Sequence, residues 1–454
     1  MIRSFSFILA LAVSPLANAQ DAPSSSENDV KISIYNNVSI IDGTGSPAQP
    51  DRTLVIEDGK IAAIIASDGF DATVYPGADI VDAGGQTVIP GLIDTHVHLR
   101  PVLSGDAGDK IIQRFLYSGI TSVRDMAGDA RVLANQSRAF DLNIAPGPNV
   151  YYSALMAGPS FFTDPRPAMS AQGKTAGDVP WMKAITADTD MTIAVAQAKG
   201  TSATGIKIYA NLSAPEVHRI AAEGRKQGMK VWAHSMVFPA RPSEVVSAGV
   251  DSISHVCRLA FESTHHTPQV YDHGVKLDYN RLDPRHPKIR TIYSDMKARG
   301  TILDATVWLY SVLEERQAKI PDAERKRAIC PSEYAVALTR LAHEMGVDIS
   351  TGTDASAPLE DAYPALHKEI ETLVHKVGMT PLEAIRSATL IGAKTIGEEN
   401  ERGTIAVGKS ADLVFLNADP ADDIANLRTV RRTLKKGFVF LRSDYEDAKN
   451  APTQ

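Results

Sequence analysis

Two histidines, His96 and His98, lie two residues apart at the end of an apolar stretch that begins near Gly91. Alternate residues of a β-strand point to the same side, so in a strand both imidazoles face the same way. Two buried imidazoles without partners carry a free-energy cost, which coordination of a metal such as zinc removes. The spacing therefore predicts part of a metal site, although such pairs also arise by chance.

Four more ligand-type side chains stand near the ends of other apolar stretches. They are Lys207, His234, His255 and Asp354. A single buried polar residue is most often a hydrogen-bonded core group. Six such residues at the ends of strand-like stretches instead favour a shared metal centre, and their nitrogen and oxygen donors suit zinc, with manganese, iron or cobalt as substitutes.

Lys207 is the unusual member of this set, because a protonated amine repels a divalent cation. A neutral lysine amine reacts with carbon dioxide to give a carbamate, an anion with two oxygens. Such a group has the size to bridge two metal ions, which lie about 3.5–4 Å apart in two-metal sites. The alternative is a lysine that is paired with a buried acid.

Strand-like and helix-like stretches alternate from residue 87 onward. The predicted ligands lie near the ends of the strand-like stretches, so this arrangement determines their positions. Helix-like stretches such as 214–227, 331–345 and 381–396 separate the later strands. This rhythm predicts an α/β fold, a (β/α)8 TIM barrel, with a doubly wound open sheet as the alternative. The strands are expected at 87–99, 121–126, 149–157, 205–210, 230–235, 251–256, 301–308 and 347–354.

Short β-branched stretches separated by Gly, Asp and Pro flank the barrel at 30–86 and 399–445. We expect these flanks to form one small β-sandwich domain beside a barrel at 87–398. Long loops after barrel strands often bind substrate, which makes 157–180 and 258–288 candidate substrate loops. The second loop carries His265, His266, His273 and His286, which are expected to be solvated, with substrate contact as the alternative.

Residues 1–19 combine Arg3, a short apolar run and the small residues Ala17 and Ala19, a pattern typical of a cleaved secretory signal. A buried N-terminal helix is the alternative. Residues 20–29 are polar and acidic, as in a flexible leader. We therefore expect a secreted protein that starts near Gln20, is periplasmic if the source is Gram-negative, and has no membrane span in its mature chain.

The composition is that of a globular protein, with 44% hydrophobic residues, 22% charged residues and a net charge of −7. This mildly acidic balance gives no reason to expect a nucleic-acid partner, so the expected partner is a small-molecule substrate. A homo-oligomer is compatible with this composition. Two cysteines, Cys257 and Cys330, are too few for a disulfide scaffold, but they can pair in an oxidising compartment.

The complete set of motifs resembles the amidohydrolase superfamily, in its binuclear branch with a carboxylated lysine. The resemblance runs from Asp42 to Lys436 and includes the segments 88–94 and 403–413. It is strongest to the imidazolonepropionase-like and prolidase-like amidohydrolases, which include dipeptidases, N-acyl amino acid hydrolases and ochratoxin-degrading amidases. Ser254 departs from the pattern, because related proteins often have Glu before the histidine that follows.

The resemblance implies a role for each residue. His96, His98 and Asp354 would bind the more buried metal, His234 and His255 the more exposed one, and carboxylated Lys207 would bridge both. Hydroxide shared by the metals would attack a carbonyl, and Asp354 would carry the proton to the leaving nitrogen. Tyr209 shares a face with Lys207 and is expected to hydrogen-bond the oxyanion or a substrate carboxylate, with simple packing as the alternative.

The implied activity is hydrolysis of an amide bond, in a dipeptide of the Xaa-Pro type or in an N-acyl amino acid. The same metals would also serve a cyclic amide, lactone or phosphotriester hydrolase, or a deaminase. A metal-binding protein that keeps only the barrel is the alternative without catalysis. Arg124 and Arg258 are weaker candidates for binding a substrate carboxylate.

Overall fold

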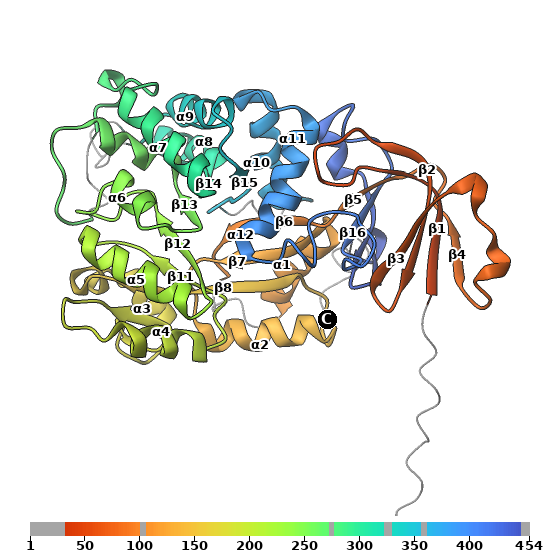
Figure 1. The fold of residues 1–454 in the computed structure, drawn as a ribbon, viewed down its shortest axis with the longest axis horizontal. Coiled ribbons are helices and arrows are strands. Elements are labelled where there is room, and N and C mark those ends of the chain that lie inside the picture. The colour runs from red at the N-terminus through yellow and green to blue at the C-terminus, as the bar shows by residue number, and fades with distance from the viewer. Residues whose placement is uncertain (1–31, 100–105, 272–276, 322–328, 356–360, 446–454) are drawn as a thin grey trace, which may run out of the picture.

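The computed structural model describes residues 32–99, 106–271, 277–321, 329–355 and 361–445. The expected signal at 1–19 and leader at 20–29 lie outside these residues, as does His273. Figure 1 shows two parts, a large ring of strands and helices and a smaller β domain at its side. Within the described residues, no helix has both the length and the apolar character needed to cross a membrane.

The large part is a (β/α)8 barrel, as predicted. Its parallel strands follow one another around the ring in chain order. They are β6 (Leu92–Val97), β7 (Ile120–Asp125), β8 (Asn149–Ala157), β11 (Gly205–Ile208), β12 (Lys230–His234), β13 (Ser252–Ser254), β14 (Ile302–Asp304) and β15 (Ile349–Ser350). Two backbone hydrogen bonds of 2.8 Å, from Thr95 N to Thr351 O and from Asp354 N to His96 O, join the last strand region to the first.

Helices cover the outside of the ring (Figure 1). They are α1 (Asp106–Tyr117), α2 (Ala130–Asp141), α4 (Met191–Gly200), α5 (Ala214–Lys226), α6 (Pro242–Ser247), α7 (Pro287–Arg299), α8 (Val307–Ala318), α9 (Ser332–Glu344), α10 (Leu366–Thr372), α11 (Pro381–Arg386) and α12 (Gly392–Ile396). Local sequence sets several starts: Ser213 with Glu216 before α5, and Thr380 with Glu383 before α11, form reciprocal caps of the first free N–H groups.

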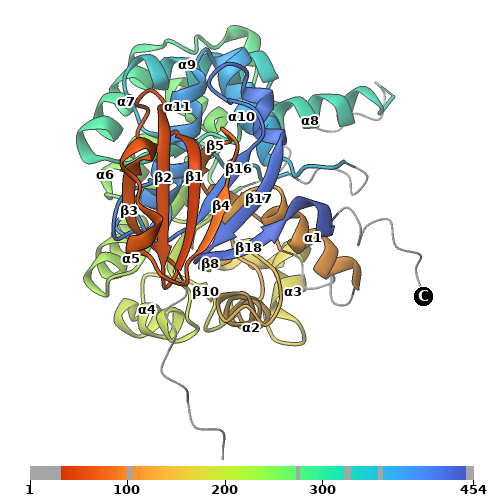
Figure 2. The ribbon, with the colours of Figure 1, turned by 90° about the vertical axis from the view of Figure 1, so that its right-hand side faces the viewer.

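The small domain combines strands from both ends of the chain, as predicted (Figure 2). Its sheet has the order β18 (Phe438–Leu441), β17 (Val430–Lys435), β16 (Leu413–Leu416), β5 (Thr87–Pro90), β1 (Ile32–Ile40), β2 (Gln49–Glu57) and β3 (Lys60–Ala66), and β4 (Asp79–Asp82) also pairs with β1. Its apolar core is separate from that of the barrel and includes Tyr35 and Phe415, whose rings are 4.7 Å apart.

One strand boundary differs from the prediction. The stretch 87–99, expected as a single barrel strand, is divided at Gly91: β5 pairs with β1 and β16 in the small domain, and β6 begins the barrel. A Cβ atom on Gly91 would lie 2.0 Å from Thr121 Oγ1, so only glycine fits at this crossing. Both halves are buried throughout, and the pattern of apolar residues therefore gave no sign of the break.

The long segment after β8 is partly structured. It contains the 3-10 turn η3 (Pro159–Thr163), the short helix α3 (Pro165–Ala171) and the strands β9 (Asp178–Val179) and β10 (Met182–Ala184). After β13 the chain forms a second 3-10 segment, η4 (Val256–Ser263). Both segments follow the carboxyl ends of barrel strands and so surround the mouth where the predicted ligands meet.

Candidate metal centre at the barrel mouth

Asp354 is the residue on which three imidazoles converge. Its Oδ1 lies 3.1 Å from His98 Nε2 and 3.8 Å from His96 Nε2, and its Oδ2 lies 3.8 Å from His255 Nε2. One donor atom from each of His96, His98 and Asp354 falls within 4.8 Å of the others, close enough to share an ion. Asp354 and His255 both adopt left-handed backbone conformations, with φ of 43° and 74°. Such strained residues are typical of functional sites.

The remaining predicted ligands extend the cluster along the ring of strands. The His255 ring lies 4.9 Å from that of His96 and 4.8 Å from that of His234. Tyr209 follows, 4.0 Å from His234 between ring centres, and Lys207 Nζ lies 4.9 Å from the Tyr209 ring. The structure thus brings together the six predicted ligands and Tyr209.

Burial favours the neutral form of three imidazoles in the cluster. It lowers the pKa of His255 to about 3 and also lowers the pKa of His96 and His234. Burial likewise lowers the pKa of Lys207 to about 8. Neutral imidazoles are the forms that bind metals, and a lysine with a lowered pKa offers more of the neutral amine that reacts with carbon dioxide.

Two nitrogen atoms of the cluster lack the hydrogen-bond partners that buried polar atoms normally have. Nε2 of His96 and Nδ1 of His234 are buried and have no hydrogen-bond partner among the described residues. Unpaired polar atoms in a protein interior are uncommon, because each costs free energy when it is removed from water. Coordination of a divalent cation would satisfy both, which makes the cluster compatible with a metal centre.

A family model described as the amidohydrolase family matches residues 87–439. The chain belongs to the amidohydrolase family. It is a hydrolase that acts on carbon–nitrogen bonds.

Curated relatives match this amidohydrolase over nearly its whole length. An imidazolonepropionase from Idiomarina loihiensis is 24% identical, in an alignment that covers 87% of this chain and 92% of that protein. An ochratoxinase from Aspergillus niger is 25% identical, in an alignment that covers 94% of this chain and 91% of that protein.

Solved structures share the fold of this amidohydrolase. A Xaa-Pro dipeptidase with methionine bound in its active site superposes with a TM-score of 0.70 at 22% identity, over 90% of this chain and 100% of that one. The ochratoxinase structure from A. niger gives a TM-score of 0.69 at 21% identity, over 91% and 96% of the two chains. Both matches confirm the predicted barrel with its attached β domain.

Asp304 at the end of β14 is a site residue that the sequence reasoning missed. Its Oδ2 lies 2.8 Å from His96 Nδ1 and accepts a hydrogen bond of 2.7 Å from Ser254 Oγ. Gly352 makes this contact possible, because a Cβ there would lie 1.9 Å from Asp304 Oδ1. A carboxylate on the second nitrogen of a metal-binding histidine fixes its tautomer and orientation. The sequence feature that could have revealed Asp304 is a lone carboxylate in an apolar strand, the same feature that revealed Asp354.

Arg124 on β7 proves to be a support of the site and not a binder of substrate. Its side chain is fully buried; NH2 donates to Asp304 Oδ2 at 3.1 Å, NH1 donates to Ser252 Oγ at 3.0 Å, and Nε donates to the Thr95 carbonyl. Its charge is therefore balanced inside the barrel. Asp304 thus supplies a carboxylate beside Ser254, whose hydroxyl donates to it.

Tyr209 points into the mouth and is held there by neighbours from the loop after β8. Arg166 on α3 donates from NH1 to the Tyr209 hydroxyl at 3.2 Å, and the Phe161 ring packs at 4.4 Å. Arg166 was not singled out from the sequence, because it lies in a loop with no periodic pattern. The contact leaves the tyrosine hydroxyl proton free to point toward a ligand.

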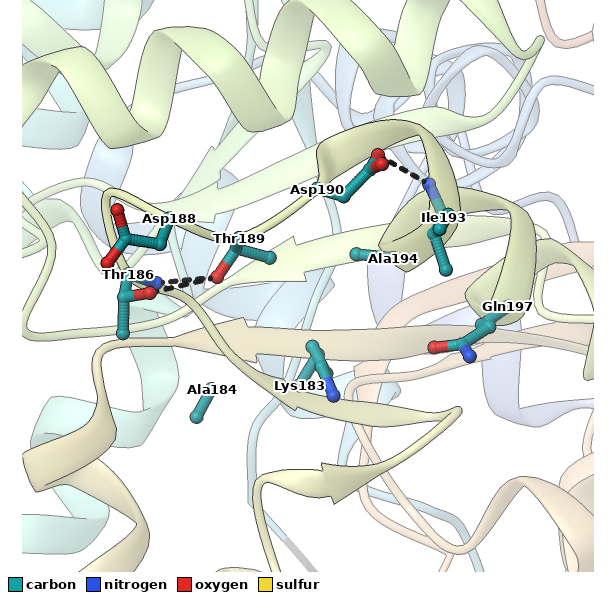
Figure 3. A pocket seen from close by; sticks show the side chains of 9 residues that line it. All are labelled: Lys183, Ala184, Thr186, Asp188, Thr189, Asp190, Ile193, Ala194 and Gln197. Atoms are coloured by element: carbon teal, nitrogen blue, oxygen red, sulfur yellow. Dashed lines mark hydrogen bonds between the residues drawn. The ribbon is translucent and has the colours of Figure 1, made fainter.

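The loop histidines that the structure describes make no contact with this cluster. His265 and His266 are exposed, and His286 Nδ1 accepts a hydrogen bond from Lys288 N at the start of α7. A surface hollow of about 390 Å³, lined by Lys183, Asp188, Asp190 and neighbours at the start of α4, is also remote from the chemistry (Figure 3). It shares none of its lining residues with the histidine cluster.

Proposed function

We propose that this amidohydrolase is an exported enzyme with two metals, which hydrolyses the amide bond of a Xaa-Pro dipeptide or an N-acyl amino acid. The observation that carries the proposal is the convergence of the six predicted ligands at one end of the barrel. The similarity to an ochratoxinase and to a Xaa-Pro dipeptidase structure supports an amide substrate with an amino acid leaving group.

The residues divide the work as follows. His96, His98 and Asp354 would hold one divalent ion, His234 and His255 the other, and carboxylated Lys207 would lie between them. Metal ions at such a site generate a nucleophile from water near neutral pH and polarise the carbonyl. Asp354 accepts the proton of the attacking water and returns it to the leaving nitrogen. Tyr209, oriented by Arg166, donates a hydrogen bond to the developing oxyanion.

A substrate screen tests the proposal. Protein loaded with zinc or manganese in the presence of bicarbonate is incubated with Xaa-Pro dipeptides and N-acyl amino acids, and free amino acid is measured. Metal-stripped protein should be inactive and should recover when metal is restored. Turnover of lactones or phosphotriesters alone, or release of ammonia alone, would overturn the proposed substrate class. Labelled bicarbonate should yield a carbamate carbon signal that the Lys207→Ala variant lacks.

Export is the second part of the proposal. Cys257 and Cys330 form a disulfide with a Cα–Cα distance of 6.3 Å, and such bonds persist in oxidising compartments. Expression of the full chain in a Gram-negative host should place the protein in the periplasmic fraction, with Gln20 as its first residue. Recovery in the cytoplasm with Met1 still present would argue against the signal.

A further inference from the structure

Arg258 occupies an aromatic cage at the edge of the candidate metal centre. It lies on η4, three residues after His255, and its guanidinium carbon lies 4.9 Å from the Tyr271 ring centre and 5.5 Å from that of Phe238. The Tyr271 ring is in turn 6.3 Å from the His234 ring and 5.8 Å from the Tyr209 ring. A single aromatic ring therefore separates this guanidinium from the cluster.

Two neighbouring arginines are each paired with a carboxylate, whereas Arg258 is not. Arg124 pairs with Asp304, and Arg166 donates to both oxygens of Asp164, at 3.0 and 2.9 Å. Within the parts of the chain that the structure describes, Arg258 has no acidic partner, and its NH2 donates only to the Tyr271 hydroxyl, at a long 3.4 Å.

Stacking on rings restrains the plane of a guanidinium and leaves its edge free. That edge carries parallel N–H groups, which match the two oxygens of a carboxylate. A half-buried cation without a counter-charge is a site that gains free energy when an anion arrives.

We propose that Arg258 binds the α-carboxylate of the substrate, and that this enzyme therefore requires a free carboxylate on the amino acid released. The inference rests on the proposed amide hydrolysis and names the residue that selects for the carboxylate of its substrates. In a dipeptide or an N-acyl amino acid one carbon separates the scissile nitrogen from this carboxylate. A cationic anchor one ring away from His234 would thus hold the amide against the metal ligands. Peptides extended beyond this residue, whose carboxylate is farther away, would be excluded.

Matched substrates test this directly. The best dipeptide of the screen is compared with its Xaa-pyrrolidide, which differs only by the missing carboxylate, and Xaa release is measured in both. N-acetylphenylalanine and N-acetylphenethylamine form a second pair, with acetate measured. The wild type should prefer each carboxylate substrate by about a hundredfold in kcat/KM, the usual size of a charged hydrogen-bonded contact.

The Arg258→Met variant should lose this preference. Its kcat/KM for the carboxylate substrate should fall about a hundredfold, mainly through KM, while turnover of the pyrrolidide stays within about threefold of wild type. Arg258→Lys should recover part of the loss. The matched control is Arg285→Met, which removes a surface arginine of the same loop that pairs with Glu344 and should leave both substrates unaffected. An unchanged preference in Arg258→Met would overturn the inference.

A binding measurement separates this inference from the proposed function. Calorimetry of metal-loaded protein with proline and with pyrrolidine reports carboxylate recognition without turnover. Binding of proline that is lost in Arg258→Met supports the inference even if no amide is hydrolysed, in which case only the proposed activity fails. If dipeptide and pyrrolidide are hydrolysed at equal rates, and proline and pyrrolidine bind equally well, the proposed activity stands and the role of Arg258 is contradicted.

Discussion

Asp354 combines two tasks because of where its oxygens lie. One oxygen faces His96 and His98, the other faces His255, and the left-handed backbone at this residue directs the carboxylate between them. The same group is thus a predicted metal ligand and the base that we propose for the attacking water. The two roles have different requirements. Metal binding needs only an oxygen donor, whereas proton transfer needs a carboxylate that can be protonated.

Asp354→Asn should separate these tasks. The amide keeps one oxygen donor and a similar volume, so the fold and part of the metal content should remain. Proton transfer is lost, and kcat should fall by about 10²–10⁴-fold, the usual size of a general acid–base contribution. Steady-state kinetics together with metal analysis check this. Turnover equal to that of wild type would remove the proton-carrying role.

Asp304 acts on the metal centre through His96. In Asp304→Asn the negative charge that balances Arg124 is lost, and the amide can present its NH2 group to His96 Nδ1. We expect metal affinity to fall about 10–100-fold, the common effect of losing such a supporting carboxylate. Competition with a chelator measures it. Ser254→Ala removes one hydroxyl contact to Asp304 and should cost much less; equal affinities in all three proteins would contradict the role.

Among the elements, η4 is the one that ties the mouth of the barrel to its outer layer. The disulfide joins Cys257 on η4 to Cys330, just before α9, across a sequence separation of 73 residues. The bond therefore holds the segment that carries both His255 and Arg258. Loop-closure entropy gives such a crosslink a stabilising contribution of about 4 kcal/mol.

Removal of the disulfide by Cys257→Ser with Cys330→Ser should lower the free energy of unfolding by about 2–4 kcal/mol. Urea unfolding of both proteins, followed by circular dichroism, measures the change. Unfolded wild-type protein should also show no free thiol until a reductant is added. Equal stability of the two proteins, or two free thiols in the untreated wild type, would contradict the bond.

Two helices meet through a buried acid. Glu369 on α10 accepts hydrogen bonds from Val307 N and Trp308 N at the start of α8, at 3.0 and 2.7 Å. Burial nevertheless raises its pKa to about 8. The folded chain therefore binds a proton that the unfolded chain releases near pH 4.5, so stability is highest below that pH and falls as the pH rises through 8.

Glu369→Gln should abolish this pH dependence. The wild type should lose about 1.4 kcal/mol per pH unit relative to the variant between pH 5 and 8, a few kcal/mol in all. Urea midpoints at pH 5, 6.5 and 8 measure the difference. A constant difference between the two proteins across this range would show that the carboxyl group is ionised in the fold.

At the scale of the whole molecule, the barrel and the β domain are joined by a direct chain connection and by hydrogen bonds between them. The chain passes from β5 to β6 through Gly91, whose N–H donates to Asp412 O at 2.8 Å, and Asp412 forms a buried ion pair with Arg402. Lys435 Nζ on β17 donates to Gly147 O at 2.8 Å, in the segment between α2 and β8 of the barrel. We therefore expect the two parts to unfold as one unit.

Phe415→Ala tests this coupling from the far side of the β domain. Phe415 is fully buried against Tyr35, and its truncation should cost about 3–5 kcal/mol. If the parts are coupled, loss of helical signal and loss of bound metal should both shift to lower temperature together. A calorimetric trace with two separate transitions, of which only one moves, would show that the domains are independent.

Much of this protein was determined by local sequence. Apolar stretches of strand length, separated by helical patterns, predicted every strand of the barrel, because period and composition are local properties of a chain. The predicted ligands followed from the same patterns: a polar residue at the end of a buried strand is conspicuous, and parallel barrel strands bring their carboxyl ends to one mouth.

Only the tertiary structure decided which partners these residues have. His96 and Asp304 are 208 residues apart, and the sequence around either residue does not predict their contact. The same holds for the two arginines that the sequence left equal: Arg124 meets an acid from another strand, whereas Arg258 lies among aromatic rings. The assignment of β5 to the small domain depended likewise on which strands it could pair with. Pattern gives the direction of a side chain, but its charge balance depends on neighbours that only folding brings together.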